Sequence, residues 1–161
     1  GHYGGVESVT WNSTPSEEFR EALRYLARLI RYSRAPLGED GPQRESIKRV
    51  GAMLRDFARG HALLYGRKEV HMEDLEVCAR TALSSMPAKR QGAVRAILHP
   101  ETGTSVKTAE VAHYGDMSLP TARKRMRLME DLGLGVVDQK GGKVVRPKPD
   151  FRWPETIPFP E

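Results

Sequence analysis

Apolar residues recur at three- and four-residue spacing along most of this chain, in segments separated by glycines and prolines. This spacing places the apolar side chains on one face of a helix. In the first half it predicts helices over residues 15–32, 43–65 and 72–85, with a loop at 36–42 and a helix end at Gly66. Helices of this kind, joined by short connections, bury their apolar faces against one another as a small antiparallel bundle.

The first helix has a start signal in TPSE, residues 14–17. Threonine suits the N-cap, proline suits the first helical position, and a glutamate three residues after the cap completes a capping box. The chain begins GHYGG without a methionine, which is typical of a trimmed fragment. We therefore expect residues 1–14 to be a remnant and an extended lead, residues 15–86 to form the bundle, and the chain to be part of a longer protein.

The second half predicts shorter helices separated by tight turns. They span residues 87–98, from a cap at Thr104 or Ser105 to Tyr114, and residues 118–132. The last of these has Ser118 at its N-cap and Pro120 in its first turn, where a missing N–H is harmless. Its apolar stripe is expected to consist of Ala122, Met126, Met129 and Leu132. The positions between them are strongly basic.

Two short β-segments follow this basic helix. Residues 136–138 and 143–145 flank QKGG, a turn sequence suited to a β-hairpin. A helix, a short helix, a tight turn, a basic helix and a hairpin together make the winged helix-turn-helix plan. The expected fold is therefore mainly α: the bundle, a winged helix-turn-helix with a short β-hairpin wing over residues 87–147, and a proline-rich tail over 148–161.

The positive charge of the chain is concentrated in the same half. Residues 87–149 carry 12 Lys/Arg and 6 Asp/Glu, a net charge of +6, whereas residues 1–86 have a net charge of +1 and residues 150–161 of −2. Such asymmetry is typical of a protein that binds a polyanion. The alternative is an uneven distribution of charge on a solvated surface with no binding role.

The stretch SLPTARKRMRLMEDLGLGVV, residues 118–137, resembles the recognition helix of bacterial winged-helix proteins, and the resemblance covers residues 88–147. It implies that the second helix of the pair lies in the major groove of double-stranded DNA, where outward Arg and Lys contact phosphates and base edges. The DNA-binding residues that it implies are Ser118, Thr121, Arg123, Lys124, Arg125, Arg127, Lys140 and Lys143. The alternative is a winged helix that contacts protein, with its charges merely solvated.

The first half carries a second resemblance. RESIKRVGAMLRDFARGHALLYGRKEVHMEDLEVC, residues 44–78, is similar to the helical lid of AAA+ ATPases of the MoxR type and of minichromosome-maintenance helicases, although His71 stands where that family prefers threonine. By this resemblance Arg44 is the sensor arginine that reaches the terminal phosphate of the nucleotide. A lid followed by a winged helix also resembles the C-terminal ends of phage and plasmid helicase-like ATPases associated with primase. The alternative is a plain helical bundle whose Gly-Arg turn only ends a helix.

The sequence contains no G-x-x-x-x-G-K-[ST] motif and no acidic strand end to hold Mg²⁺. We therefore expect this chain alone to be no enzyme and to hold no cofactor, with ATP and Mg²⁺ bound only by an upstream ATPase core of the parent protein. No H-E-x-x-H or paired metal spacing occurs among the histidines, and one cysteine cannot make a thiolate site. His61 is expected to be a hydrogen-bonded core histidine and Cys78 an inert apolar residue.

The remaining features concern location and the tail. A single cysteine excludes an intramolecular disulfide and suits the reducing cytoplasm, and no apolar run approaches the length of a membrane span. The tail PKPDFRWPETIPFPE has five prolines, so we expect an extended segment. Four apolar side chains are expected to pack it against an apolar surface, either of this chain or of a missing domain: Phe151, Trp153, Ile157 and Phe159.

Two classes of function remain open from the sequence. The first is a DNA-binding module, the lid and winged helix of a helicase- or initiator-like ATPase in DNA replication. The second is a stand-alone transcriptional regulator or protein-interaction adaptor, in which the bundle self-associates and the winged helix contacts protein or operator DNA.

Overall fold

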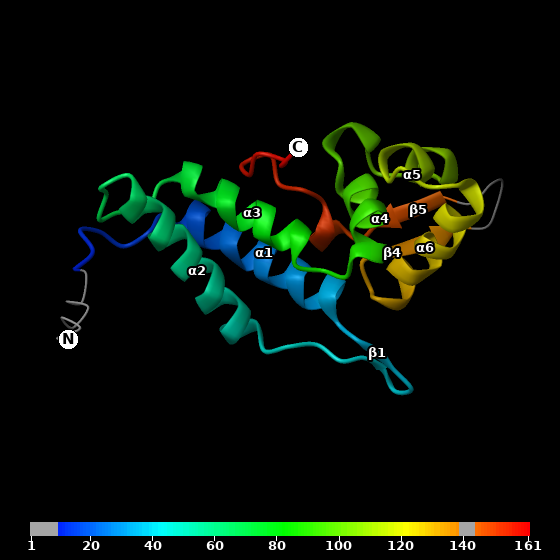
Figure 1. Cartoon of the computed structure of the whole chain (residues 1–161), viewed down its shortest axis with the longest axis horizontal. Coiled ribbons are helices and arrows are strands. Elements are labelled where there is room, and N and C mark those ends of the chain that lie inside the picture. The colour runs from blue at the N-terminus through cyan, green and yellow to red at the C-terminus, as the bar shows by residue number, and fades with distance from the viewer. Residues whose placement is uncertain (1–9, 139–143) are drawn as a thin grey trace, which may run out of the picture.

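The computed structural model describes residues 10–138 and 144–161. Over these residues the fold is mainly α, with two small antiparallel sheets, as the sequence predicted. The helices are α1 Glu17–Arg34, α2 Ile47–Leu64, α3 Leu75–Ser84, α4 Ala88–Leu98, α5 Thr108–Tyr114 and α6 Leu119–Asp131. The strands are β1 Leu37–Gly38, β2 Gly41–Pro42, β3 Val106–Lys107, β4 Gly135–Asp138 and β5 Val144–Pro147. Figure 1 shows α1–α3 at one end of an elongated molecule, the other helices and the larger sheet at the opposite end, and the C-terminal segment between them.

Helices α1, α2 and α3 run antiparallel to their neighbours as an up-down-up bundle (Figure 1). The expected cap of α1 was wrong by two residues: Ser16, not Thr14, is the N-cap, and its Oγ accepts a hydrogen bond of 3.1 Å from the backbone N–H of Phe19. Glutamates fill the first turn of α1 and arginines its last turn. This arrangement stabilises the helix, because the negative charges lie at the positive end of the helix dipole and the positive charges at its negative end.

The segment between α1 and α2 differs from the prediction in two ways. Residues 36–42, expected to be a loop, contain the small β1–β2 hairpin, in which Leu37 pairs with Pro42 and Gly41 has a φ of +96°. Helix α2 begins at Ile47 and not at residue 43. The backbone N–H of Gln43 donates to the Pro36 carbonyl at 2.8 Å, so this residue closes the hairpin and precedes the helix.

The second half has the element order α4–β3–α5–α6–β4–β5, with a three-stranded antiparallel sheet in the order β3-β5-β4. Strand β3 was missed, because Val106 was expected on a helix reaching back to residue 104. Instead Val106 pairs with Val145 of β5, and α5 starts at Thr108. A strand of two residues gives no period in the sequence, and its partner lies almost 40 residues away. This order of elements is the one that the winged helix-turn-helix plan predicts.

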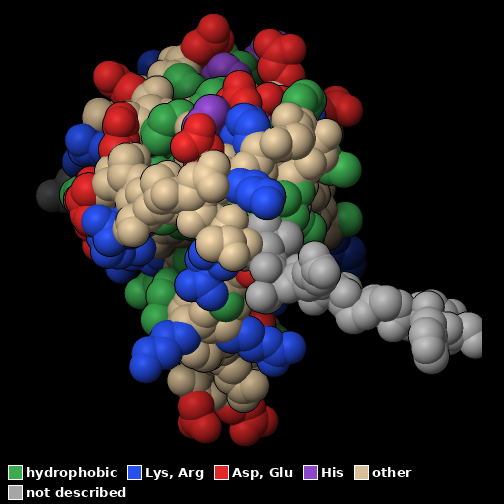
Figure 2. All heavy atoms as spheres, turned by 90° about the vertical axis from the view of Figure 1, so that its left-hand side faces the viewer, with side chains coloured by type: hydrophobic (Ala, Val, Ile, Leu, Met, Phe, Trp, Pro, Cys, Tyr) green, Lys and Arg blue, Asp and Glu red, His purple; other side chains and the backbone are tan. Residues whose placement is uncertain are grey.

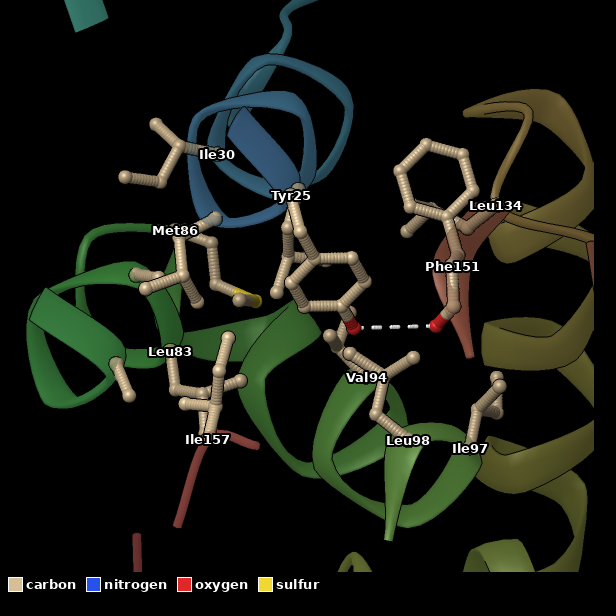
Figure 3. Close-up of a cluster of buried hydrophobic side chains, with 14 of the residues drawn as sticks. Tyr25, Ile30, Leu83, Met86, Val94, Ile97, Leu98, Leu134, Phe151 and Ile157 are labelled. Atoms are coloured by element: carbon tan, nitrogen blue, oxygen red, sulfur yellow. Dashed lines mark hydrogen bonds between the residues drawn. The ribbon is translucent and has the colours of Figure 1, made fainter. Parts of the chain in front are cut away.

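The buried side chains of both halves belong to one continuous hydrophobic cluster. It includes Leu26 of α1, Leu54 of α2, Val94 of α4, Met126 of α6 and Phe151 of the tail. In Figure 3 Tyr25 projects from α1 toward Phe151, and its Oη donates a hydrogen bond of 3.2 Å to the Phe151 carbonyl. The two ends of the molecule therefore share a core.

The tail packs over this junction, so the apolar surface that it covers belongs to this chain. Residues Pro149–Phe151 form a short 3-10 helix where the sequence predicted an extended segment. Phe151 and Ile157 are buried, while Trp153 and Phe159 are partly buried against the core. The Trp153 ring meets Tyr25 of α1 edge-on, with 5.7 Å between centroids. Arg95 of α4 donates from Nη1 to the Pro160 carbonyl at 2.9 Å. The tail thus contacts α1 on one side and α4 on the other.

Gly92 allows α4 to approach the turn after α5. A Cβ atom on Gly92 would lie 2.7 Å from the carbonyl oxygen of Gly115, closer than a real contact permits. Gly92→Ala is therefore expected to lower the free energy of unfolding by about 1–3 kcal/mol, the usual cost of overpacking. Urea denaturation measures this change in the free energy of unfolding.

The matched control is Gly60→Ala, also in a helix but with nothing within 4 Å of a Cβ atom. Alanine there should stabilise α2 by about 0.5–1 kcal/mol, because glycine loses more backbone entropy on folding. Equal effects of the two substitutions would contradict the close approach.

Candidate nucleic-acid interface

Helix α6 is anchored by the apolar stripe that the sequence predicted. The side chains of Ala122, Met126, Met129 and Leu132 are fully buried. The carboxylate of Glu130 accepts a hydrogen bond of 3.1 Å from the backbone N–H of Val137, which ties the end of α6 to β4. The helix is therefore fixed on the core and on the wing, and its opposite face is free to contact a ligand.

Three of the four predicted cations of α6 lie on its exposed face. Arg123, Lys124 and Arg127 are exposed, whereas Arg125 is half-buried. No carboxylate of the residues described here lies within 4.0 Å of the charged atoms of these four side chains. Cations without acidic neighbours give a surface a positive potential that attracts polyanions. The structure thus brings the four basic residues together on one helix.

The start of α6 has the expected cap. The Oγ of Ser118 accepts a hydrogen bond from the backbone N–H of Thr121 at 3.4 Å and lies 2.9 Å from the Thr121 Oγ1. Ser118 is exposed and Thr121 half-buried. Both hydroxyls lie beside the first turn of α6, where the backbone N–H groups of Thr121 and Ala122 already donate to Ser118.

The turn before α6 holds the two helices of the pair at a fixed angle. The backbone N–H of Gly115 donates to Val111 and that of Met117 to Ala112, each at 3.0 Å. Asp116 has a φ of +48°, a left-handed conformation that aspartate tolerates better than most residues. The tight turn predicted at Gly115-Asp116 is confirmed.

The wing is described only in part. Lys140 and Lys143, the two predicted wing contacts, lie outside the described residues. Sequence reasoning missed Arg146 on β5, whose side chain is exposed and lies 3.5 Å from the Asp138 carboxylate of β4. The alternation of buried Val145 with exposed Arg146 could have identified it, because successive side chains of a strand point to opposite faces.

Arg44, the predicted sensor, lies between the two ends of the molecule. It is exposed, precedes α2, and forms no ion pair within the described ranges. Its guanidinium stacks on Tyr32 of α1, with 3.8 Å from Cζ to the ring centroid, and Nη2 donates to the Leu132 carbonyl at 3.2 Å. In this chain Arg44 thus joins α1 to the end of α6, and a role toward nucleotide stays a prediction.

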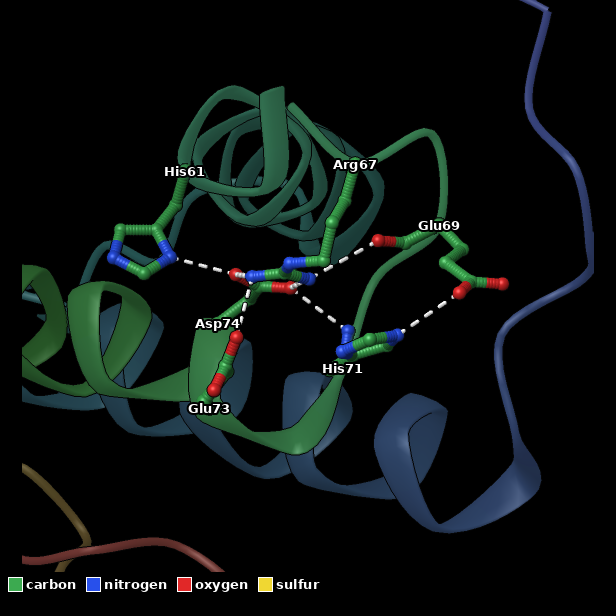
Figure 4. A network of polar contacts seen from close by, with 6 residues as sticks. All are labelled: His61, Arg67, Glu69, His71, Glu73 and Asp74. Atoms are coloured by element: carbon green, nitrogen blue, oxygen red, sulfur yellow. Dashed lines mark hydrogen bonds and ion pairs between the residues drawn. The ribbon is translucent and has the colours of Figure 1, made fainter. Parts of the chain in front are cut away.

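The lid-like motif forms a polar network at the corner between α2 and α3. Figure 4 shows Arg67 and His61 converging on Asp74, which is fully buried. Arg67 donates to both carboxylate oxygens at 2.8 and 2.9 Å, His61 Nδ1 lies 2.6 Å from Oδ1, and the backbone N–H of His71 donates to Oδ2 at 2.7 Å. Burial alone would raise the pKa of Asp74, but these hydrogen bonds outweigh it and hold the pKa at about 2. The network fixes the corner.

Two further predictions concern single residues. His61 is hydrogen-bonded, as expected, but its side chain is 27% exposed and lies outside the hydrophobic core, so the prediction of a core histidine was wrong. Cys78 is fully buried, its Sγ donates to the Leu54 carbonyl at 3.3 Å, and burial raises the pKa of its thiol to about 12. A protonated thiol without access to solvent is unreactive.

The far end of the bundle has a different surface from α6. Figure 2 views this end and shows Lys and Arg side chains interspersed with Asp and Glu. Neighbouring charges of opposite sign cancel one another at a distance, so this surface attracts a polyanion less than α6 does.

None of the helices within residues 10–138 and 144–161 is long and apolar enough to cross a membrane. Comparisons with protein-family models, with curated proteins and with solved structures found no match to this chain.

Proposed function

We propose that this chain is a DNA-binding module that places α6 in the major groove of double-stranded DNA. The observation that carries the proposal is the exposed set of Arg123, Lys124 and Arg127, which have no carboxylate partner among the described residues, on the second helix of a helix-turn-helix. A buried stripe holds the other side of the same helix. An α-helix fits the width of the major groove, where Arg and Lys reach both phosphates and base edges.

The binding is expected to be largely electrostatic. A module of this size neutralises about 4–6 phosphates, so log K should fall with log[salt] at a slope of roughly −4 to −5. Arg123 and Lys124 lie near the start of α6, the part of a recognition helix that contacts base edges. Each is expected to contribute about 1–3 kcal/mol of discrimination if it forms a bidentate contact with a base.

The experiment is a titration of labelled duplex DNA with the wild type and with an Arg123→Ala/Lys124→Ala variant, at two salt concentrations. The variant should bind at least about tenfold more weakly at the lower salt concentration and show a slope reduced by about 2, one for each lost phosphate contact. Both side chains are exposed, so thermal unfolding should be unchanged.

The matched control is Lys68→Ala/Arg80→Ala, which removes the same charge from exposed positions on the bundle. It should bind DNA as the wild type does, apart from a small change due to net charge. If the α6 variant also binds as tightly as the wild type at both salt concentrations, the cations of α6 are only solvated. The adaptor function is then favoured.

The parent of this module is, in our proposal, a helicase- or initiator-like ATPase in DNA replication. The support is the lid-like sequence of residues 44–78 and its position directly before the winged helix-turn-helix. ATP and Mg²⁺ belong in this proposal to an upstream core. A G-x-x-x-x-G-K-[ST] motif upstream in the full open reading frame would support this, and a frame without such a core would leave a stand-alone DNA-binding protein.

A further inference from the structure

A groove of about 360 Å³ lies between α1 and α2, away from α6. Its apolar lining includes Phe19, Leu23 and Ala27 of α1 and Ile47 of α2. Ile47 is 40% exposed although it is a large apolar residue at the start of a helix that packs on the bundle. The volume lies within the range of ligand-binding pockets. Phe19 and Ala27 are buried, so of these four residues Leu23 and Ile47 supply the apolar surface that the described part of the chain leaves uncovered in this groove.

Four arginines also line this groove: Arg20 and Arg24 of α1, and Arg55 and Arg59 of α2. Glu17 pairs with both arginines of α1, at 2.6 and 2.9 Å. The Arg59 guanidinium lies 5.0 Å from the Trp11 ring centroid. Arg55 is exposed and has no ion-pair partner in the part of the chain that the structure describes. Among the described residues, one carboxylate thus pairs with two of the four arginines and none lines the groove itself, so the groove has a net positive charge.

We propose that this groove, the arginine groove, binds an acidic amphipathic segment of a partner protein. Apolar side chains of the segment enter between α1 and α2, as an amphipathic helix lays its apolar face into a groove. Its carboxylates meet the guanidinium groups, whose planar donors match a carboxylate with two parallel hydrogen bonds. The complementarity of charge, together with the apolar lining, identifies this partner.

The distribution of charge favours a peptide over other anions. Two of the arginines lie on each helix, about one turn apart. This spacing suits several carboxylates distributed along a peptide chain. A fatty acid has a single carboxylate at one end and would leave most of them without a partner. Duplex DNA supplies phosphates but no flexible apolar side chains, so it would leave the apolar lining in water. The inference is independent of DNA binding by α6.

The test uses a synthetic peptide of about 16 residues, with leucines on one helical face and glutamates elsewhere. A second peptide has the same composition with the leucines dispersed, and a third has lysine in place of glutamate. Fluorescence anisotropy of each peptide measures binding to the full chain. We expect the patterned acidic peptide to bind, the dispersed peptide to bind at least about tenfold more weakly, and the basic peptide not to bind.

Two variants of the groove separate its two features. Arg55→Glu should weaken binding of the patterned peptide by about tenfold or more, through like-charge repulsion, and Ile47→Ser should weaken it by removing apolar contact. Both side chains are exposed, so circular dichroism should show an intact fold. Lys89→Glu, an exposed charge reversal on α4, is the matched control and should bind as the wild type does.

Several results would overturn the inference. Equal binding of the patterned and dispersed peptides would show attraction by charge alone. Displacement of the patterned peptide by oleate would identify a lipid site, and loss of duplex DNA binding in Arg55→Glu would assign the groove to the DNA surface. The Arg123→Ala/Lys124→Ala variant should bind the patterned peptide normally, so failure of the DNA proposal and failure of this one are distinguishable.

Discussion

Asp74→Ala is expected to lower the free energy of unfolding by about 3–5 kcal/mol, the cost of breaking a buried charged pair by removing one partner. The carboxylate is fully buried and receives hydrogen bonds from Arg67, His61 and the backbone of His71. Alanine would leave the Arg67 guanidinium, whose side chain is only 18% exposed, without its main partner. Urea denaturation monitored by circular dichroism measures the loss.

The matched control is Asp56→Ala, which removes an exposed aspartate of α2 and should change stability by no more than about 0.5 kcal/mol. Asp74→Asn keeps the size of the side chain but not its charge, so its loss of stability should lie between those of Asp74→Ala and Asp56→Ala. A loss for Asp74→Ala as small as that of Asp56→Ala would show that the network does not stabilise the corner.

The same carboxylate makes the chain sensitive to acid. The pKa of Asp74 is lowered from 3.8 to about 2 in the folded state. Its contribution to the free energy of unfolding is therefore complete above about pH 4 and is lost as the pH falls toward 2. The wild type should therefore lose stability over this interval more steeply than Asp74→Asn. Parallel curves of stability against pH would contradict the assignment.

Phe151→Ala is expected to lower the free energy of unfolding by about 3–5 kcal/mol, as other truncations of buried phenylalanine do. Phe151 is 2% exposed and its ring lies 4.8 Å from that of Tyr32. Its removal opens a cavity where α1, Leu134 and the tail meet (Figure 3). Differential scanning calorimetry should show a lower Tm and, if the junction is weakened enough, separate transitions for the two ends of the molecule.

Phe57→Ala is the matched control for this truncation. Phe57 is 44% exposed on α2. Its truncation should lower the free energy of unfolding by less than about 1 kcal/mol. If both substitutions lower the Tm equally, the tail contributes no more to the core than an exposed residue does.

The sequence predicted the helices well because their signal is local. The stripe from Ala122 to Leu132 was correct at each position, since a helical period repeats within a few residues. Helix ends were less accurate. Ser16 and Thr14 are both suitable caps, and only the hydrogen bond to Phe19 decides between them.

The elements that the sequence did not predict depend on distant partners. Strand β3 is two residues long and exists because Val106 meets Val145. The role of Asp74 needs an arginine, a histidine and a backbone N–H gathered by the fold of two helices. Arg44 was interpreted from its motif alone, and its contact with Leu132, 88 residues away, could not be seen in a local pattern.

The arginine groove was likewise absent from the sequence interpretation. Arg20 and Arg24 are one turn apart and were recognisable as neighbours on a helix. Their juxtaposition with Arg55 and Arg59 depends on the packing of α2 against α1. Pairwise packing of helices is set by side-chain shape across the whole interface, which spacing along one helix does not reveal.

The hydrogen bond from Tyr25 to the Phe151 carbonyl joins residues 126 positions apart, and this sets an order of events during synthesis on the ribosome. The bundle and the helix-turn-helix are made largely of local contacts and can form as they emerge, whereas their junction must wait until residue 151 is outside the exit tunnel. Until then the apolar side chains around Tyr25 face water. A nascent chain stalled before the tail would therefore be a better substrate for chaperones and proteases than one stalled after it.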